Sequence, residues 1–175
     1  MHSQPSQSFL DRALAIAASE NLVEDAAAAI RKGANPNYID AHGFTAALYF
    51  ADYGNVDGVA MVFTLTLEKT NASPPTYGQT SPASQTLQTN RHGVSPAILL
   101  AQRGDIVGVL RLAALDPKVL AQPIFNHLQP NTGITTGDVV ALLRSGVVVD
   151  DKFETTMRKL GFSTLEMFRC LDEAV

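Results

Sequence analysis

Two stretches of this chain, residues 43–59 and 93–109, follow one residue pattern. Both place glycine and alanine at the same positions, and residues of the same kind at several others. Internal self-similarity of this kind predicts an architecture of stacked repeats. In such a protein, function lies on a surface built by several repeats rather than in a single catalytic pocket. The matched pairs are Gly43/Gly93, Thr45/Ser95, Ala47/Ala97, Leu48/Ile98, Ala51/Ala101, Gly54/Gly104, Asn55/Asp105, Val56/Ile106, Gly58/Gly108 and Val59/Val109.

The chain before the first of these stretches already predicts a pair of helices. A first helix is predicted over 9–18, with Ser8 as its N-cap and a broad apolar face. A second helix is predicted to begin at a capping box of Asn21 and Glu24 and to end at Lys32, just before a glycine.

The two similar stretches repeat this plan. Thr45 and Ser95 each precede a short helix that ends at a glycine, and Pro96 takes the first helical position, where its missing N–H costs nothing. Asn55 and Asp105 are then expected to cap a second helix in each stretch. The chain is therefore predicted to be built from successive helix pairs.

Three phrases of the second pair carry a family resemblance. Residues 33–37 read Gly-Ala-Asn-Pro-Asn, residues 40–45 read Asp-Ala-His-Gly-Phe-Thr, and residues 51–55 read Ala-Asp-Tyr-Gly-Asn. They resemble the turn, the inner-helix start and the inner-helix end of the ankyrin repeat. Residues 90–105 resemble the same pattern. The resemblance implies an all-α, ankyrin-like helical-repeat solenoid.

The spacing of the repeats departs from the ankyrin pattern. Gly43 and Gly93 are 50 residues apart, whereas the ankyrin period is about 33 residues. The extra residues lie in a stretch rich in Ser, Thr, Pro and Gln, which predicts a long loop that is either functional or disordered. The resemblance implies a single domain over 1–175, with repeats at about 8–39, 40–69 and 90–116, a degenerate repeat at 120–150, a flexible loop at 70–89 and a helical cap at 151–175.

Gly58 and Gly108 recur inside the second helix of each stretch. Glycine in a helix costs about 1 kcal/mol relative to alanine, so its recurrence needs a reason. We expect each glycine to allow close approach of the preceding helix, where the bulky Phe50 and Leu100 stand.

The C-terminal segment 151–175 is predicted to form two short helices that cap the stack. Asp151 with Glu154, and Ser163 with Glu166, have the spacing of capping boxes. An open stack needs to cover its last hydrophobic face. The apolar residues expected to bury together there are Met157, Leu160, Phe162, Leu165, Phe168 and Leu171.

Composition excludes several classes of partner. The net charge is −4, and the 13 Lys and Arg residues form no basic run, so nucleic acid is not an expected partner. No apolar run approaches the roughly 20 residues that span a bilayer, so membrane insertion is not expected. A single cysteine and the lack of a signal-peptide pattern predict a cytoplasmic protein. The alternative is a protein secreted into a host cell without a cleavable signal peptide.

The candidate chemical groups are few. Cys170 lies among apolar residues, which predicts a buried, unreactive thiol. His42 and His92 occupy equivalent positions but have no third ligand nearby in sequence, and His127 is expected at the surface or at a helix end. No catalytic motif is present, so we predict neither an enzyme, nor a metal site, nor a cofactor.

The ankyrin resemblance implies non-catalytic recognition of a protein partner on the concave face. Two alternatives are an effector that engages a host protein and a structural subunit of a larger assembly or homo-oligomer. Carried over by position, the predicted partner-binding residues are Tyr38, Asp40, His42, Tyr49, Asp52, Tyr53, Arg91, His92, Gln102 and Arg103.

Overall fold

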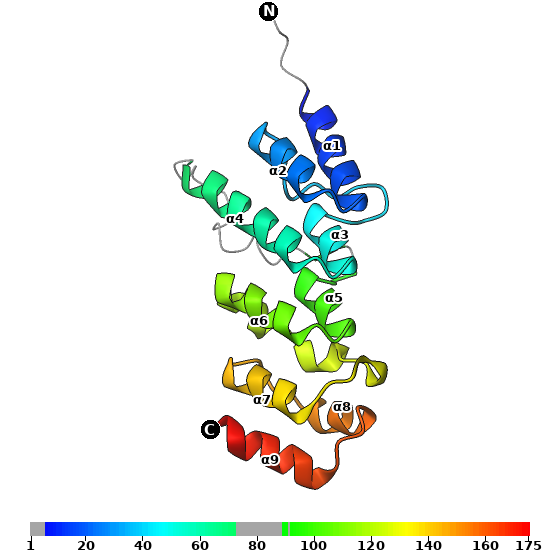
Figure 1. Cartoon of the computed structure of the whole chain (residues 1–175), viewed down its shortest axis with the longest axis vertical. Coiled ribbons are helices and arrows are strands. Elements are labelled where there is room, and N and C mark those ends of the chain that lie inside the picture. The colour runs from blue at the N-terminus through cyan, green and yellow to red at the C-terminus, as the bar shows by residue number, and fades with distance from the viewer. Residues whose placement is uncertain (1–5, 73–88, 91) are drawn as a thin grey trace, which may run out of the picture. The chain divides into compact units, whose positions relative to one another are not determined.

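The computed structural model describes residues 6–72, 89–90 and 92–175. All regular structure in these residues is helical, which confirms the predicted all-α class (Figure 1). The internal contacts divide the chain into two compact units, the first ending at Pro96 and the second beginning at Ala97.

The first unit contains two stacked helix pairs. Its helices are α1 (Gln7–Ser19), α2 (Val23–Arg31), α3 (Ala46–Asp52) and α4 (Val56–Ala72). α1 packs against α2 and α3 against α4, and the pairs stack through contacts of α1 with α3 and of α2 with α4 (Figure 1). Ala18, Ala26 and Ala51 are completely buried among these helices, and their small side chains allow the backbones to approach closely.

The second unit contains α5 (Pro96–Gln102) from its second residue onward, followed by α6 (Ile106–Leu115) and short 3-10 turns. α7 (Thr136–Arg144) packs against α6 and α9 (Thr164–Ala174), and α8 (Phe153–Lys159) packs against α9 and the turn at 124–127. Phe125 and Phe153 meet edge to face there, with ring centroids 4.8 Å apart. The three 3-10 turns are Pro117–Ala121, Ile124–His127 and Pro130–Thr132.

The residue pattern shared by 43–59 and 93–109 is matched by a shared backbone geometry. Gly43 and Gly93 have φ of 82° and 75°, values that favour glycine. The side chains of Asn55 and Asp105 accept hydrogen bonds from the amides of Gly58 and Gly108 at 2.9 and 2.8 Å. The predicted caps of α4 and α6 are therefore confirmed.

Gly58 allows close contact between α4 and α3, as its recurrence predicts. A Cβ atom at this position would lie 2.6 Å from Cγ and Cδ1 of the completely buried Phe50. Real Cβ atoms essentially never approach another atom so closely. The aromatic ring thus occupies the space that any other residue at position 58 would need.

The predicted starts of the first two helices are wrong. The amides of Phe9 and Leu10 already donate to the carbonyl of Ser6, so α1 begins at Gln7 and Ser8 lies inside its first turn. Asn21 does not cap α2 because its backbone is left-handed, with φ of 58°, and its side chain instead accepts from Asn55 Nδ2 at 2.7 Å. α2 ends at Arg31, one residue before the predicted end.

The predicted loop at 70–89 begins too early, because α4 continues to Ala72. The rest of that prediction, at 73–88, lies outside the described residues.

One of the two predicted capping boxes near the C-terminus is wrong and one is confirmed. No side chain caps α8; Glu154 forms an ion pair of 2.8 Å with Arg158 instead of bonding back to Asp151. Ser163 and Glu166 form the predicted box at the start of α9. A further box of Thr135 and Asp138, which the sequence analysis missed, begins α7.

The apolar cluster predicted for 157–171 does not form as a whole. Met157 is completely buried, but Leu165, Phe168 and Leu171 are exposed. α9 buries Met167 and Cys170, whereas Leu165, Phe168 and Leu171 follow one another at intervals of three residues and share an exposed side of the helix. The last helix therefore presents an uncovered apolar face.

Candidate functional site

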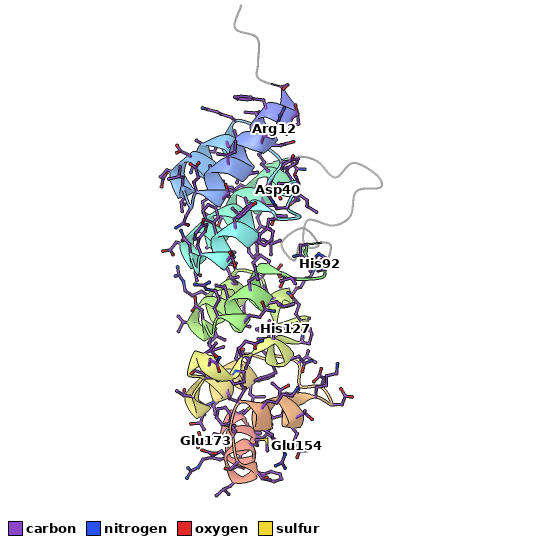
Figure 2. All side chains as sticks on the ribbon, turned by 90° about the vertical axis from the view of Figure 1, so that its right-hand side faces the viewer. Arg12, Asp40, His92, His127, Glu154 and Glu173 are labelled. Carbon is purple, nitrogen blue, oxygen red and sulfur yellow. The ribbon has the colours of Figure 1, made fainter. Side chains whose placement is uncertain are left out.

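A groove of about 330 Å³ lies in the first unit, between α1, the loop that follows α2, and α3. We call it the loop groove. Four predicted partner-binding residues, Tyr38, Asp40, His42 and Tyr49, line it. Figure 2 labels Arg12 and Asp40, which come from α1 and from the loop. The full lining is Arg12, Ala15, Ile16, Ser19, Tyr38, Asp40, Ala41, His42 and Tyr49.

The loop side of the groove is built around the Asp40 carboxylate. Its Oδ1 accepts hydrogen bonds from the amides of His42 and Phe44, at 2.9 and 3.0 Å. The amide of Asp40 donates to the carbonyl of Phe44, and Gly43 donates to the carbonyl of Asp40. The loop is thus closed on itself by local bonds, which holds the His42 backbone in one position.

Tyr49 joins this loop to α3. Its hydroxyl donates to Asp40 Oδ2 at 2.6 Å, and its ring lies 5.0 Å from that of Phe44. Burial and the bond to Asp40 raise the pKa of Tyr49 to about 12. Burial also acts to raise the pKa of Asp40, but the hydrogen bonds from Tyr49, Phe44 and His42 outweigh it, and the net pKa is lowered.

The Asp40–Tyr49 pair is therefore suited to positioning rather than to proton transfer. Near neutral pH the carboxyl stays ionised and the phenol stays protonated, whereas an efficient general acid or base has a pKa close to the working pH. Both carboxylate oxygens already accept bonds within the protein.

A buried acid that the sequence analysis missed fixes the start of the loop. Asp11 on α1 is buried, and its Oδ1 accepts bonds from the Asn35 amide at 2.7 Å and from Gln7 Nε2 at 2.8 Å. Lys69 Nζ donates to the carbonyl of Ala34 at 2.9 Å, and burial lowers the pKa of this lysine. The signal for Asp11 was a carboxylate within an otherwise apolar helix face, between Leu10 and Leu14.

The α1 side of the groove was also missed. Arg12 is exposed, and Ile16, an apolar residue within the helix predicted over 9–18, is 58% exposed. Both lie one turn apart on the same side of α1. Exposure of this side depends on how α1 packs against α2 and α3, so the sequence pattern alone does not reveal it.

Asp52 and Tyr53, predicted with Tyr49, do not line the groove. They lie at the exposed end of α3, where the Tyr53 hydroxyl donates to the carbonyl of Ser19 at 2.7 Å. Together with the Asn55–Asn21 bond, Tyr53 ties the end of α3 to the end of α1. Its hydroxyl is therefore a link within the scaffold.

The remaining predicted residues fall elsewhere. His92 is exposed in a loop built like that of His42, and its amide donates to Asn90 Oδ1 at 2.9 Å. Gln102 and Arg103 belong to the second unit, where Gln102 is half-buried and Arg103 exposed. Arg91 lies outside the described residues.

The other candidate chemical groups are structural in their surroundings. Cys170 is completely buried, with Sγ 3.8 Å from the carbonyl of Thr136, and burial raises the pKa of its thiol. His127, expected at the surface or at a helix end, is half-buried as the last residue of the 3-10 turn Ile124–His127, and burial lowers its pKa. Across residues 6–72, 89–90 and 92–175, no group of three or more His, Cys, Asp or Glu side chains is placed to hold a metal ion.

None of the helices described is long and apolar enough to cross a membrane. No protein-family model, curated protein or solved structure matches this chain.

Proposed function

We propose that this chain is a non-catalytic recognition module that binds a protein partner in the loop groove. The observation that carries the proposal is the convergence of Tyr38, His42 and Tyr49 with Arg12 and Ile16 around one groove. Tyrosine and arginine dominate the binding energy of protein interfaces. The volume of about 330 Å³ lies at the lower end of the range for binding clefts, which suits one or two side chains of a partner.

The groove is held in shape before any partner arrives. The loop is fixed through Asp40 to Tyr49 of α3, and its start is fixed through Asp11 to α1. Preorganisation of this kind lowers the entropy lost on binding. The side chains of Tyr38 and His42 are then presented on a rigid backbone.

We also propose an ankyrin-like helical-repeat solenoid as the arrangement that carries this surface. In support, the chain stacks two helix pairs in the first unit. The loops around Asp40 and Asn90 also share their bonds: each side chain accepts from the amides two and four residues on. A cytoplasmic protein is the proposed setting, and an effector acting in a host cell is the alternative.

Capture of a partner by groove variants tests the proposal. Wild type and a Tyr38→Ala/His42→Ala variant are compared in pull-downs read by quantitative mass spectrometry, and each captured protein is then purified and titrated by calorimetry. The hydrogen bonds that close the loop around Asp40 do not involve the side chains of Tyr38 or His42. The variant should therefore keep the wild-type circular dichroism. We expect a partner that the variant binds at least about tenfold more weakly.

His92→Ala is the matched control, because His92 occupies the equivalent place in the second similar stretch. This variant should keep the partner. Equal binding by wild type and the Tyr38→Ala/His42→Ala variant would contradict a role for the loop groove. Tyr49→Ala and Tyr53→Ala are unsuitable for this test, since both hydroxyls hold the scaffold together.

A further inference from the structure

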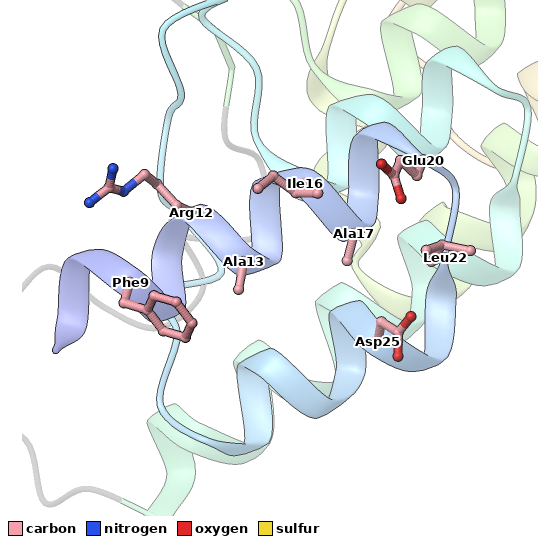
Figure 3. Close-up of a pocket in the computed structure, with 8 residues that line it drawn as sticks. All are labelled: Phe9, Arg12, Ala13, Ile16, Ala17, Glu20, Leu22 and Asp25. Carbon is pink, nitrogen blue, oxygen red and sulfur yellow. The ribbon is translucent and has the colours of Figure 1, made fainter. Parts of the chain in front are cut away.

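A second groove, of about 540 Å³, lies in the first unit and is lined mainly by apolar side chains. We call it the terminal groove. Its walls come from α1 and from the turn that leads into α2 (Figure 3). Its lining is Phe9, Arg12, Ala13, Ile16, Ala17, Glu20, Leu22 and Asp25.

α1 has two apolar sides, and only one of them is covered within the first unit. Leu10 and Leu14 are buried, whereas Phe9 is 60% exposed and Ile16 is exposed to a similar extent. At 3.6 residues per turn, Phe9, Ile16 and Glu20 lie within about 40° of one another around α1. Large apolar side chains that gather uncovered on one face mark an interaction site.

The form of the terminal groove favours a helix as its occupant. On their covered side, α1 packs against α3 and α2 packs against α4, so this helix pair already receives helices there (Figure 1). The terminal groove is formed by the same two helices. Amphipathic helices bind such grooves through apolar side chains spaced three or four residues apart.

The charge at one end of the groove limits which helix can bind. Glu20 and Asp25 lie at that end, beside Leu22 (Figure 3). Both acids are exposed, and neither forms an ion pair within the described part of the chain. The acidic end of the groove therefore lacks a cation.

The two acids differ in how well their own helices explain them. Asp25 lies in the first turn of α2, where the helix favours a negative charge. Glu20 is the C-cap of α1, where the partial negative charge of the helix end opposes a carboxylate. A cation from a binding partner would offset the Glu20 charge and the helix end together.

Arg12 does not neutralise the acidic end. It lies at the other end of the groove, beside Phe9, and its Nε donates to the carbonyl of Ser8 on the same helix at 3.3 Å (Figure 3). Arg12 and Glu20 are eight residues apart, or about 12 Å along α1. This distance exceeds the Debye length of about 8 Å at physiological ionic strength.

We infer that the terminal groove binds an amphipathic helix of a partner protein, and that this helix carries Lys or Arg at one end of its apolar side. Phe9 and Ile16 contact the apolar side chains of the partner, and its cation pairs with Glu20 and Asp25. Like-charge repulsion at the acidic end disfavours an anionic membrane surface as the occupant. This binding goes beyond the proposed role of the loop groove, which contains neither Phe9 nor Glu20.

The test selects the occupant from a displayed library of helical peptides of about 16 residues, randomised on one side of an alanine-rich helix. Peptides enriched on wild type should carry apolar residues three or four apart and Lys or Arg at one end. Each enriched peptide is then synthesised and titrated by fluorescence anisotropy. A copy with Glu in place of its Lys or Arg should bind at least about tenfold more weakly.

Phe9→Asp removes the apolar contact and should weaken the enriched peptides at least about tenfold. Phe9 is exposed in the first turn of α1, where an aspartate is favoured, so circular dichroism should stay unchanged. Val107→Asp is the matched control, because Val107 is 68% exposed on α6 and lies outside the groove. Enriched peptides that bind Phe9→Asp as tightly as wild type would overturn the inference.

Glu20→Lys combined with Asp25→Lys tests the assigned chemistry. This variant should bind the Glu-substituted peptide more tightly than the original peptide, which reverses the wild-type preference. An unchanged preference would overturn the pairing with Glu20 and Asp25.

Two further measurements separate the terminal groove from other occupants and from the loop groove. Tyr38→Ala/His42→Ala should bind the enriched peptides as wild type does, and a loss of binding would assign them to the loop groove and overturn the inference. Sedimentation of the protein alone should show no association that Phe9→Asp abolishes. Such association would assign the groove to a second copy of the chain and would also overturn the inference.

Discussion

The loops at Asp40 and Asn90 have the same backbone and different attachments. In both, the side chain accepts bonds from the amides two and four residues later. In the first loop, the Asp40 carboxylate also accepts a hydrogen bond from Tyr49 of α3. In the second loop, the residue equivalent to Tyr49 is Leu99, which has no hydroxyl to donate. A shared set of glycines and capping residues thus fixes the form of a loop, and a single variable position decides whether it is anchored.

The largest expected effect concerns how closely α3 and α4 approach. Gly58→Ala should lower the free energy of unfolding by about 1–3 kcal/mol, since the new Cβ atom overlaps the Phe50 ring. Helix propensity alone would favour alanine by about 1 kcal/mol. A loss of stability would therefore show that the clash with Phe50 outweighs helix propensity. Chemical denaturation followed by circular dichroism gives the value.

Phe50→Leu supplies the control, because leucine stands at the equivalent position 100. The loss from Gly58→Ala should shrink in the Phe50→Leu background. A Gly58→Ala variant as stable as wild type would show that the ring gives way easily.

The two loops should also differ in how strongly they resist opening. Asp40→Ala removes three acceptor bonds and should cost about 2 kcal/mol, whereas Asn90→Ala removes two and should cost about 1 kcal/mol. Amide hydrogen exchange at Phe44 and Val94 measures the two openings separately. Equal loss of protection at both amides would mean that Tyr49 adds nothing to the anchoring.

The Tyr49–Asp40 bond should give the first loop a pH dependence that the second lacks. Asp40 has a lowered pKa, so its contribution is complete above the ordinary value of 3.8 and is lost as pH falls through the folded value. The pKa of Tyr49 is raised from 10.0 to about 12, so its contribution is complete below 10.0 and is lost between these values.

Tyr49→Phe should therefore lower stability by about 1 kcal/mol between pH 3.8 and 10.0, and by less on either side. Melting temperatures of wild type and variant across this range provide the measurement. A constant difference at every pH would assign the effect to packing of the ring.

The smallest effect is expected at the caps of α4 and α6. An aspartate cap interacts more favourably with a helix N-terminus than asparagine does, by about 0.3–1 kcal/mol. Asp105→Asn should therefore lower stability slightly. Asn55→Asp should bring no gain, because Asn55 Nδ2 donates to Asn21 and the new carboxylate has no proton to give. A clear rise in the melting temperature of Asn55→Asp would show that this link is unimportant.

The sequence predicted those features that depend on neighbouring residues. Thr45, Asn55, Asp105 and the Ser163–Glu166 box act within one turn of the chain, so their spacing alone identifies them. Helical periodicity likewise predicted the helices of the first two pairs, with ends shifted by one to three residues.

Features that depend on packing were missed or misassigned. The role of Asp11 depends on its hydrogen bond with Asn35, which packing brings beside it from another part of the chain. Arg12 lines the loop groove because α1 packs next to the loop. Ile16 and Phe168 have apolar side chains on amphipathic helices, and only the arrangement of neighbouring helices shows that nothing covers them. Four of the predicted partner-binding residues, Tyr38, Asp40, His42 and Tyr49, do line one groove. The first three were close in sequence from the start, because they lie on one short loop.

The single cysteine of the chain can be used to measure how often its last helix opens. Cys170 is sealed against Thr136 where α9 meets α7, so a reagent reaches it only while that helix is detached. The rate of labelling under native conditions, divided by the rate for a free cysteine peptide at the same pH, gives the fraction of time that α9 spends away from its neighbour. The native cysteine thus reports how large a fraction of molecules has its last helix detached at any moment.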